Sequence, residues 1–416
     1  MMRAGAIPVG LARERTGDAQ RSAAGARAEW SPLAALADVR TEWRDLVARA
    51  LEPNVFYDPA FALPAARAFG ADVGAVLVWS KTSPRLIGLF PARIERRYGV
   101  IATLNGWTHP YAPLGVPLID RDEADAAIAA FLDHVEVGAG LPKLVMLPLI
   151  ARDGAFAAAL ARVLARRAGA SASFGEHARA LLAPRNRENY LEHIAGKKLK
   201  ELRRQRRRLE ESGAVVHMAA SGPAAAVALT DFMALEASGW KGRAGGAARA
   251  HAAIETFVRQ AVTALAAKGD ARVDRLIHDG HPVAASITLR SGNAAWFWKI
   301  AYDEAFARAS PGVQLTLDLT RDLLADGSLA RTDSCATAGH PMIDHLWKER
   351  LTLCDMLIAP GASSMAQLRL ARPLETLRRA VISSVKKARA SLRAGPRPAR
   401  AVPAGSPCRS SSSAFP

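Results

Sequence analysis

An order of predicted helices and strands that occurs twice in the 416 residues limits the fold more than any other feature of this sequence. Apolar residues spaced three and four apart predict helices, and short apolar runs between turn residues predict strands. The first copy has two helices and then three strands, at 33–50, 58–69, 75–79, 85–94 and 100–107. The second copy has the same order, at 224–238, 251–268, 271–278, 282–290 and 294–302. We therefore expect two related α/β units.

A short echo in the sequence supports this repeat. The segment APLGVPL at 112–118 lies 197 residues before ASPGVQL at 309–315, and Ile87-Gly88 lies at the same offset from Ala284-Ala285. A match over one short loop can arise by chance. The echo therefore supports the repeat only together with the order of the elements.

The second of these loops has the composition of a helix start. Ser310 is a favoured N-cap, Pro311 suits the first helical position, and Gly312 has no Cβ to hold a ligand away from the backbone. Such a helix end can bind a pyrophosphate through its N–H groups, although a plain structural cap has the same residues. The next residues alternate as in a strand, but the pattern runs to Gly327, about 15 residues, which favours a helix.

The first copy differs from the second at this loop. It has Pro117 where the second copy has Gln314, and it lacks the capping serine. We therefore expect that only the second unit keeps a site that can bind a pyrophosphate.

The net charge of +17 comes from two segments. Residues 197–208 contain eight Lys and Arg and one Glu, and residues 361–416 contain eleven basic residues and one acidic residue. The first segment predicts an amphipathic helix with a narrow apolar stripe and no aromatic residue among its cations. A solvated helix face, a site for a phosphate-bearing ligand such as tRNA or a nucleotide cofactor, and a membrane contact all remain open for it.

Composition excludes several classes of protein. Three cysteines without metal-ligand spacing indicate neither a disulfide framework nor a zinc site, and no metal is expected. No apolar run approaches the ~20 residues of a membrane-spanning helix. We expect a cytoplasmic protein, with contact to the inner face of the membrane as an open possibility. Residues 1–29 and 395–416 are expected to be disordered.

Several pieces of the second half together resemble the CelD/BcsL-type acyltransferases of the GNAT superfamily, which are associated with cellulose and exopolysaccharide production. These pieces are the basic helix, EASGWKGRAG at 236–245, Tyr302-Asp303, Ser310-Pro311-Gly312, Asp333 and Trp347-Lys348. The sequence is also similar to the Fem-type transferases, which are built from two GNAT-like units and use aminoacyl-tRNA as the acyl donor.

The resemblance implies a fold and a domain organisation. The fold would be α/β, with two tandem GNAT-like units of mixed, mostly antiparallel sheet flanked by helices. The basic helix would join the units, and a basic amphipathic helix would follow them. The expected boundaries are 30–184 for a degenerate N-terminal unit, 185–360 for the acyltransferase unit and 361–394 for the last helix.

The resemblance also implies a reaction in which an amine or hydroxyl attacks a thioester carbonyl directly. Acetyl-CoA or another acyl-CoA would be the cosubstrate, and the acceptor would be a small molecule. The Trp298–Ala301 backbone would meet the carbonyl. Candidate catalytic residues are Tyr302, Asp303 and His340, and candidate cofactor-binding residues are Lys299, Ser310, Pro311, Gly312, Val313 and Gln314. Candidate substrate-binding residues are Glu236, Trp240, Lys241, Asp333 and Lys348.

Some of these residues also have ordinary structural interpretations. Asp303 can be a turn residue, His340 can begin a helix, and Tyr302 and Trp240 can be packing residues. Lys299 lies on an apolar strand and requires an anionic partner, either Asp333 or a cofactor phosphate. Cys335 is interpreted as an apolar filler, because no base or elbow motif accompanies it.

The favoured function is acyl transfer from acyl-CoA to a sugar or envelope precursor. A Fem-like transferase that uses aminoacyl-tRNA is the first alternative, and a nucleic-acid-binding protein without enzymatic activity is the second. Apart from tRNA under the first alternative, nucleic acid is not an expected partner of the enzyme. Residues 373–393 form a basic amphipathic helix, which could dock on the protein or contact anionic lipid.

Overall fold

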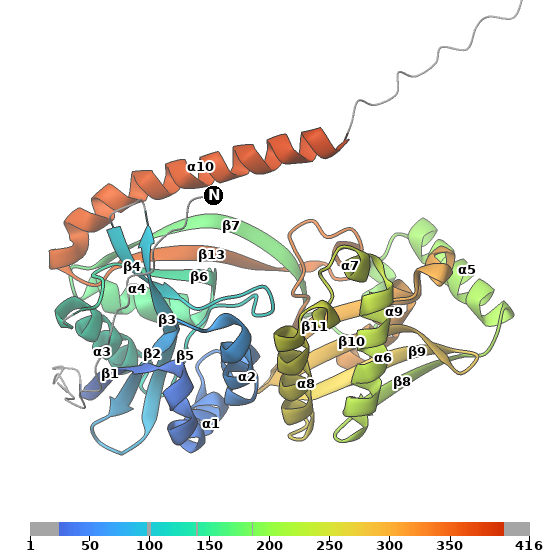
Figure 1. Ribbon diagram of the computed structural model, residues 1–416, viewed down its shortest axis with the longest axis horizontal. Coiled ribbons are helices and arrows are strands. Elements are labelled where there is room, and N and C mark those ends of the chain that lie inside the picture. Colours follow the sequence, from blue (N-terminus) through green and yellow to red (C-terminus); the bar gives the residue numbers. More distant parts are fainter. Residues whose placement is uncertain (1–24, 98–100, 139, 185, 395–416) are drawn as a thin grey trace, which may run out of the picture. The chain divides into compact units, whose positions relative to one another are not determined.

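The computed structural model describes residues 25–97, 101–138, 140–184 and 186–394 (Figure 1). The chain divides into two units, Met1–Arg372 and Pro373–Pro416. Residues 1–24 and 395–416, where disordered ends were predicted, lie outside the described residues.

The first half of Met1–Arg372 contains seven strands and four α-helices among its described residues. They are β1 (Ala26–Pro32), α1 (Arg40–Arg49), α2 (Pro59–Phe69), β2 (Gly74–Ser80), β3 (Leu86–Arg97), β4 (Ile101–Gly106), β5 (Leu118–Ile119), α3 (Ala124–Val137), β6 (Val145–Ala151), α4 (Ala155–Ala165) and β7 (Ala170–Leu182). Short 3₁₀ turns η1 (Leu33–Val39) and η2 (Val55–Tyr57) precede α1 and α2. Strand β1 begins at Ala26, so the predicted disordered leader is wrong for residues 26–29.

The second half contains the remaining elements. They are η3 (Tyr190–His193), α5 (Gly196–Glu211), β8 (Val215–Ser221), α6 (Ala224–Ser238), α7 (Trp240–Arg243), η4 (Ala248–Ala250), α8 (Ala252–Ala266), β9 (Ala271–His278), β10 (His281–Ser291), β11 (Ala294–Tyr302), η5 (Glu304–Ala309), α9 (Pro311–Ala325), β12 (Arg331–Asp333), η6 (Ile343–His345), β13 (Glu349–Ala359) and η7 (Ala362–Ser364). The helix predicted after Ser310 is confirmed as α9. The strand-like alternation misleads because α9 is buried on more than one side: Leu315 belongs to one core cluster, and Leu317 and Leu319 belong to another.

All these strands form one mixed sheet, in the order β1-β2-β3-β4-β6-β13-β7-β12-β11-β10-β9-β8, with β5 paired to β3 off this path. The two halves exchange strands at its centre. Strand β13 of the second half lies between β6 and β7, and β7 of the first half pairs with β12. The halves therefore share a continuous hydrogen-bonded sheet.

The predicted repeat is visible in the pairing of the strands. Gly88 of β3 lies opposite Val78, and Ala285 of β10 lies opposite Arg275, so both members of the pair shift by 197 residues. In each half a helix, α3 or α9, then leads to a strand that is parallel to the previous one. The predicted fold class, two tandem GNAT-like units joined by a basic helix, is confirmed by this arrangement.

An aromatic cluster fills the space where helices α2 and α8 pack together. The rings of Phe61 on α2 and Phe257 on α8 lie 5.2 Å apart, and both contact Trp298 of β11, with ring centres at 5.5 and 6.3 Å. Burial of three such side chains contributes several kcal/mol, at about 25 cal/mol per Å² of apolar surface. This cluster fixes the position of β11 relative to the first half.

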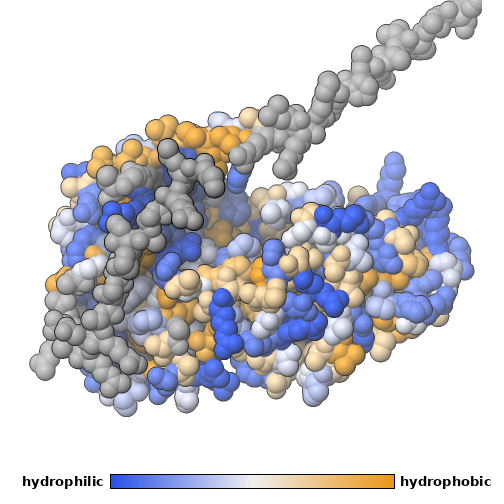
Figure 2. Space-filling view, in the orientation of Figure 1, coloured by the Kyte–Doolittle hydropathy of each residue, from blue (hydrophilic) through white to orange (hydrophobic). Residues whose placement is uncertain are grey.

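Helix α10 (Met365–Ala394) continues from Met1–Arg372 into the second unit and contains Pro373. The predicted C-terminal amphipathic helix is thus present. Within the second unit its apolar residues Leu377, Val381 and Val385 are exposed, and apolar residues are visible along α10 in Figure 2. Among the described residues, no helix has both the length and the apolar character that crossing a bilayer requires.

Candidate active site

A cleft opens where strands β11 and β12 separate. Residues Ala294–Trp296 of β11 pair in parallel with Arg331–Asp333 of β12, and β11 continues beyond this pairing to Tyr302. Beyond the pairing lies a cavity of about 270 Å³. Its lining comes from both halves of the chain, and consists of Pro110, Pro113, Phe297, Trp298, Lys299, Ile300, Ser334, Cys335, Ala336, Thr337, His340, Met342 and Ile343.

Lys299 lines this cleft, and its ammonium pairs with Glu236. Lys299 Nζ lies 3.2 Å from Glu236 Oε1, and the side chains are 14% and 1% exposed. Lys299 Nζ also lies 4.2 Å from the centre of the Tyr111 ring. The proposed pairing of Lys299 with Asp333 is therefore wrong, and a protein carboxylate already meets the requirement for an anion near this cation.

Glu236 belongs to the last two turns of α6 and is held by two groups. Its Oε2 accepts a hydrogen bond from Ala248 N at 2.9 Å, while Oε1 contacts Lys299. Glu236 also lines a small cavity of about 30 Å³ with Gly239, Trp240 and Tyr302. The ion pair thus lies between the two cavities beside β11.

Tyr111 is a residue of this site that the sequence did not indicate. Burial, together with the nearby Glu236 carboxylate, raises the pKa of the Tyr111 phenol to about 12. The phenol therefore stays neutral at neutral pH, and its ring is available to the Lys299 ammonium. Tyr111 directly precedes the first echo segment, so the loop repeat was a signal that could have drawn attention to it.

Asp333 is buried and is engaged by the protein. Its Oδ2 pairs with Arg179 of β7 at 2.5 Å, and its Oδ1 accepts from Cys335 N at 2.9 Å. Arg179 also donates to the carbonyl of Pro113 at 2.9 Å. The carboxylate that was predicted to contact substrate therefore joins β7, β12 and the first-half loop.

The predicted phosphate turn is less open than expected. Gly312 is buried, and a Cβ added to it would lie 3.2 Å from the Tyr302 ring. Val313 N and Gln314 N both donate to the Ser310 carbonyl, and Pro311 has no N–H. Only the Gly312 N–H is left at this helix end, so the expectation of an open cradle of amide groups is wrong.

The Ser310 and Gln314 side chains do not serve this helix end either. Ser310 is the N-cap with φ of 51°, but its hydroxyl makes no capping hydrogen bond. Gln314 is buried and donates to the Leu202 carbonyl at 3.0 Å. Its amide therefore joins α9 to the basic helix α5.

The three predicted catalytic residues differ in their surroundings. The Asp303 carboxylate accepts from Ala305 N at 2.9 Å and so caps η5. His340 lines the cleft, and its Nδ1 accepts from Met342 N at 3.3 Å. A neutral imidazole that accepts at Nδ1 carries its proton on Nε2, so Nε2 is available as a hydrogen-bond donor in the cleft. Tyr302 ends β11 and is 37% exposed.

The predicted acceptor residues Trp240 and Lys241 lie on the short helix α7. The Trp240 side chain is 58% exposed, and the backbone N–H of Trp240 donates to Glu304 Oε1 at 2.7 Å. The exposed ring is consistent with a substrate platform. For Lys241 the backbone lies in α7, and its side chain is outside the described part of the chain.

Lys348 lies away from the cleft lining, next to Tyr190. Its Nζ is 5.5 Å from the centre of the Tyr190 ring, and its N–H donates to the Tyr190 hydroxyl at 3.0 Å. Tyr190 in turn donates to Glu349 at 2.5 Å. These contacts give Lys348 a role in holding β13 at η3.

Cys335 lines the cleft but has no features of a nucleophile. Burial, and the neighbouring Asp333 carboxylate, raise the pKa of the Cys335 thiol well above its ordinary value. A thiol with a raised pKa is a poor nucleophile. The interpretation of Cys335 as a filler residue agrees with this environment.

The basic helix α5 packs its apolar stripe inward, with Leu202 and Leu209 buried. Arg204 pairs with Glu201, and Arg206 pairs with Glu210 and Asp318. Within the described ranges the other cations of this helix make no ion pair and are exposed: Lys197, Lys198, Lys200, Arg203, Arg207 and Arg208. A groove of about 650 Å³ lies between α5 and α9, with Arg203 and Arg207 in its lining.

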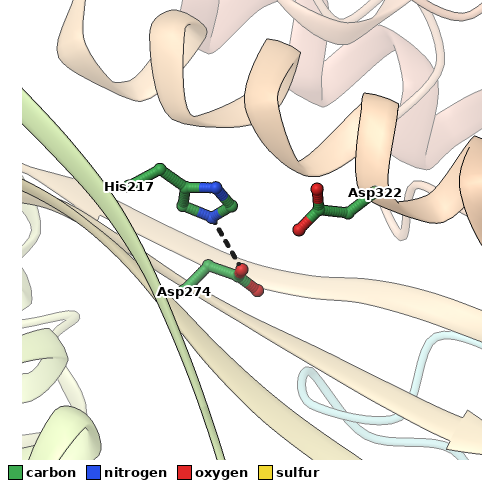
Figure 3. Close-up of side chains that lie close together, drawn as sticks. All are labelled: His217, Asp274 and Asp322. Atoms are coloured by element: carbon green, nitrogen blue, oxygen red, sulfur yellow. Dashed lines mark hydrogen bonds and ion pairs between the residues drawn. The ribbon is translucent and has the colours of Figure 1, made fainter.

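One cluster has the residue types of a metal site (Figure 3). His217 of β8 contacts Asp274 of β9 at 2.9 Å, and Asp322 of α9 faces both. However, the Arg272 guanidinium bonds to Asp274 at 2.5 Å and to Asp322 at 2.6 Å. Because a guanidinium already neutralises both carboxylates, the cluster is an ion-pair network, and no metal is assigned to it.

Comparisons with known proteins agree with this geometry. Residues 196–357 match the family model described as acetyltransferase (GNAT) domain. These residues form a GNAT-type acyltransferase domain. Strands β11 and β12 and all predicted site residues lie inside the matched range, whereas Pro110 and Pro113 of the cleft lining lie outside it. No curated protein matches the chain.

Two of the similar solved structures illustrate the likeness in fold. One is the C-terminal domain of a candidate lysylphosphatidylglycerol synthetase from Agrobacterium fabrum, with TM-score 0.51 and 12% identity over 80% of this chain and 95% of that one. The other is FemX, with TM-score 0.53 and 10% identity over 79% and 98%. At these identities the likeness concerns the fold.

Proposed function

We propose that the chain transfers an acyl group from acyl-CoA to an amine or hydroxyl of a small acceptor. The observation that supports this most directly is the cleft beside β11, in a domain that matches acetyltransferases. A pantetheine arm could run along β11 where β12 no longer pairs with it. The thioester carbonyl would then meet the Trp298–Ala301 backbone.

The transfer would be a direct displacement. The acceptor lone pair attacks the carbonyl carbon, the C–S bond breaks with its electron pair on sulfur, and the acyl group passes to the acceptor nitrogen or oxygen. The Lys299 ammonium at the cleft wall favours the negative charge that develops on the carbonyl oxygen. The proton that the acceptor loses ends on the departing CoA thiolate, to which the Nε2–H of His340 would donate a hydrogen bond.

Two regions would supply the remaining binding. To admit the donor phosphates at the start of α9, the Tyr302 ring must move away from Gly312. Arg203 and Arg207 of α5 add positive charge beside the first turns of α9. For the acceptor, Trp240 and Tyr302 frame the small cavity on the other side of β11. The acceptor class that the family resemblance favours is a sugar or another envelope or exopolysaccharide precursor.

Calorimetric titration with acetyl-CoA tests this proposal. Ala336→Trp places an indole in the cleft lining, whereas Ala338→Trp adds the same side chain to an exposed position of the same loop. We expect the cleft variant to weaken acetyl-CoA binding at least tenfold and the control to stay within twofold. Absence of binding to the unmodified chain, or equal binding by both variants, would contradict the proposal.

A second candidate is transfer from aminoacyl-tRNA. The six exposed cations of α5 without an ion pair favour it, because phosphate backbones bind such a surface in a salt-dependent manner. If it holds, tRNA binds with a steep dependence on salt, acetyl-CoA has no effect, and neutralising the six cations removes the tRNA binding. Uniform binding of duplex DNA without any transferase activity would indicate a nucleic-acid-binding protein instead.

We also propose that α10 contacts the inner face of an anionic membrane. Leu377, Val381 and Val385 form an exposed apolar stripe on a helix that also carries Arg378, Arg379 and Lys386. Such a helix lies in the lipid interface. We expect cosedimentation with vesicles that contain 30% anionic lipid, roughly a physiological surface charge, and none with neutral vesicles. Val381→Asp should abolish cosedimentation, whereas Ser384→Asp, which adds the same charge at another exposed position, should only weaken it.

A further inference from the structure

A second groove, separate from the acyl cleft, lies over helices α1, α2 and α8. Its volume is about 640 Å³, which is within the range of small-molecule sites. It shares no residue with the lining of the acyl cleft. The lining residues are Arg40, Arg44, Pro59, Ala60, Leu63, Pro64, Arg67, Arg259, Gln260, Thr263, Ala264 and Ala267.

Both halves of the chain contribute to this groove. Helix α2 provides residues 59, 60, 63, 64 and 67, and helix α8 provides residues 259, 260, 263 and 264, with Ala267 directly after its end. Steps of one and three residues place each set on one face of its helix. The groove therefore lies where α2 packs against α8.

The charge in this groove is entirely positive. Four arginines line it, and its lining contains neither Asp nor Glu. Arg259 pairs with Glu255 at 2.8 Å. Over the part of the chain that the structure covers, Arg40, Arg44 and Arg67 are exposed and make no ion pair. Three guanidinium groups are thus available around one opening, and guanidinium binds phosphate and carboxylate groups in a bidentate manner.

The floor of the groove is apolar. It is formed by Pro59, Ala60, Leu63 and Pro64 of α2, which are buried or half-buried, and the exposed Ala264 and Ala267 extend this apolar surface. In Figure 2 strongly hydrophilic and apolar residues lie side by side on the face where Figure 1 shows α2 and α8. A floor of this kind suits the apolar body of a ligand, and the arginines suit its anionic head.

We propose that this groove binds an amphipathic organic anion, with a phosphate or carboxylate head and an apolar body. The inner faces of the same two helices carry Phe61 and Phe257, which contact Trp298 in the acyl cleft. A ligand in the groove therefore contacts the two helices that hold β11 in place.

The fluorescent anion 8-anilinonaphthalene-1-sulfonate is the probe for this site, with decyl phosphate as its competitor. The full chain is titrated beside three variants. Arg44→Gln/Arg67→Gln removes two of the available cations. Ala264→Trp fills the floor without a change of charge, and Lys197→Gln/Lys198→Gln removes the same charge from the exposed start of α5. Thermal unfolding of each variant shows whether it folds.

We expect the double arginine variant and Ala264→Trp to weaken probe binding at least tenfold, and the lysine control to stay within twofold. Decyl phosphate should displace the probe, and inorganic pyrophosphate at the same concentration should not. Equal binding by all four proteins would overturn the proposal. So would displacement by pyrophosphate as effective as that by decyl phosphate, since the apolar floor would then contribute nothing.

Discussion

The ammonium of Lys299 and the carboxylate of Glu236 lie 3.2 Å apart beside β11, with only 14% and 1% of their side chains exposed. The pair separates the acyl cleft on one side of β11 from the small cavity on the other. A buried charge that loses its partner costs about 3–5 kcal/mol, much more than the pair contributes over an apolar substitute.

This ion pair predicts a strongly non-additive double-mutant cycle. Glu236→Gln and Lys299→Met should each lower the free energy of unfolding by about 3 kcal/mol, because each leaves an uncompensated charge. The loss of unfolding free energy in the double variant should be smaller than the sum of the two single losses. The difference should be about 1 kcal/mol or more, which is the order of known coupling energies. Urea unfolding of the four proteins measures the coupling. Additive losses would show that the two groups do not depend on each other.

Truncation of the Tyr302 side chain should raise the affinity of the chain for acetyl-CoA. Its ring lies against Gly312 and occupies the space that the missing side chain leaves at the first turn of α9. Tyr302→Ala removes the ring, so acetyl-CoA should bind several-fold more tightly, because a closed site lowers apparent affinity. Tyr302→Phe keeps the ring and is the matched control, with binding within twofold of the unmodified chain. Calorimetry that finds both variants equally weakened would assign Tyr302 to the binding surface itself.

Local pattern was sufficient for much of the fold. Helix α6 has the predicted bounds, 224–238, because Pro223 directly before it and Gly239 directly after it mark its two ends. Strands β9 and β11 also have the predicted bounds. Strands β7 and β13, by contrast, were not predicted. Ser, Glu, His and Arg interrupt β7, and its partners β12 and β13 come from the other half of the chain, a pairing that no local pattern encodes.

The site was predictable in its residue types and not in its contacts. The requirement for an anion near Lys299 follows from its apolar strand, but the choice between Glu236 and Asp333 depends on how α6 crosses β11. Gly312 was predicted to leave room for a ligand. In the structure Tyr302 from the end of β11 uses that room, and only the three-dimensional distance between the two residues reveals it.

Arg179 predicts a large loss of stability at the exchanged strands. It is 3% exposed, pairs with Asp333 of β12 and donates to the Pro113 carbonyl. Arg179→Met leaves the Asp333 carboxylate buried without its partner, so unfolding should become easier by about 3–5 kcal/mol. Arg152→Met removes an exposed arginine that pairs with Glu176 and should cost less than about 1 kcal/mol. Chemical denaturation compares the two, and similar small losses would mean that the Arg179 pair does not hold the halves together.

His217 predicts a pH-dependent contribution to stability. The hydrogen bond to Asp274, against a smaller opposing effect of burial, raises the pKa of His217 above its ordinary 6.5. A base whose folded pKa is raised stabilises the fold fully below its unfolded pKa, and this contribution is lost as the pH rises through the folded pKa. His217→Gln should therefore lower the free energy of unfolding by about 1–2 kcal/mol at pH 6, and by less at pH 9, where the histidine is neutral. The exposed His281→Gln is the control, with no such trend between the two pH values. A His217→Gln loss that grows from pH 6 to pH 9 would show that the neutral imidazole, and not the ion pair with Asp274, holds β8 to β9.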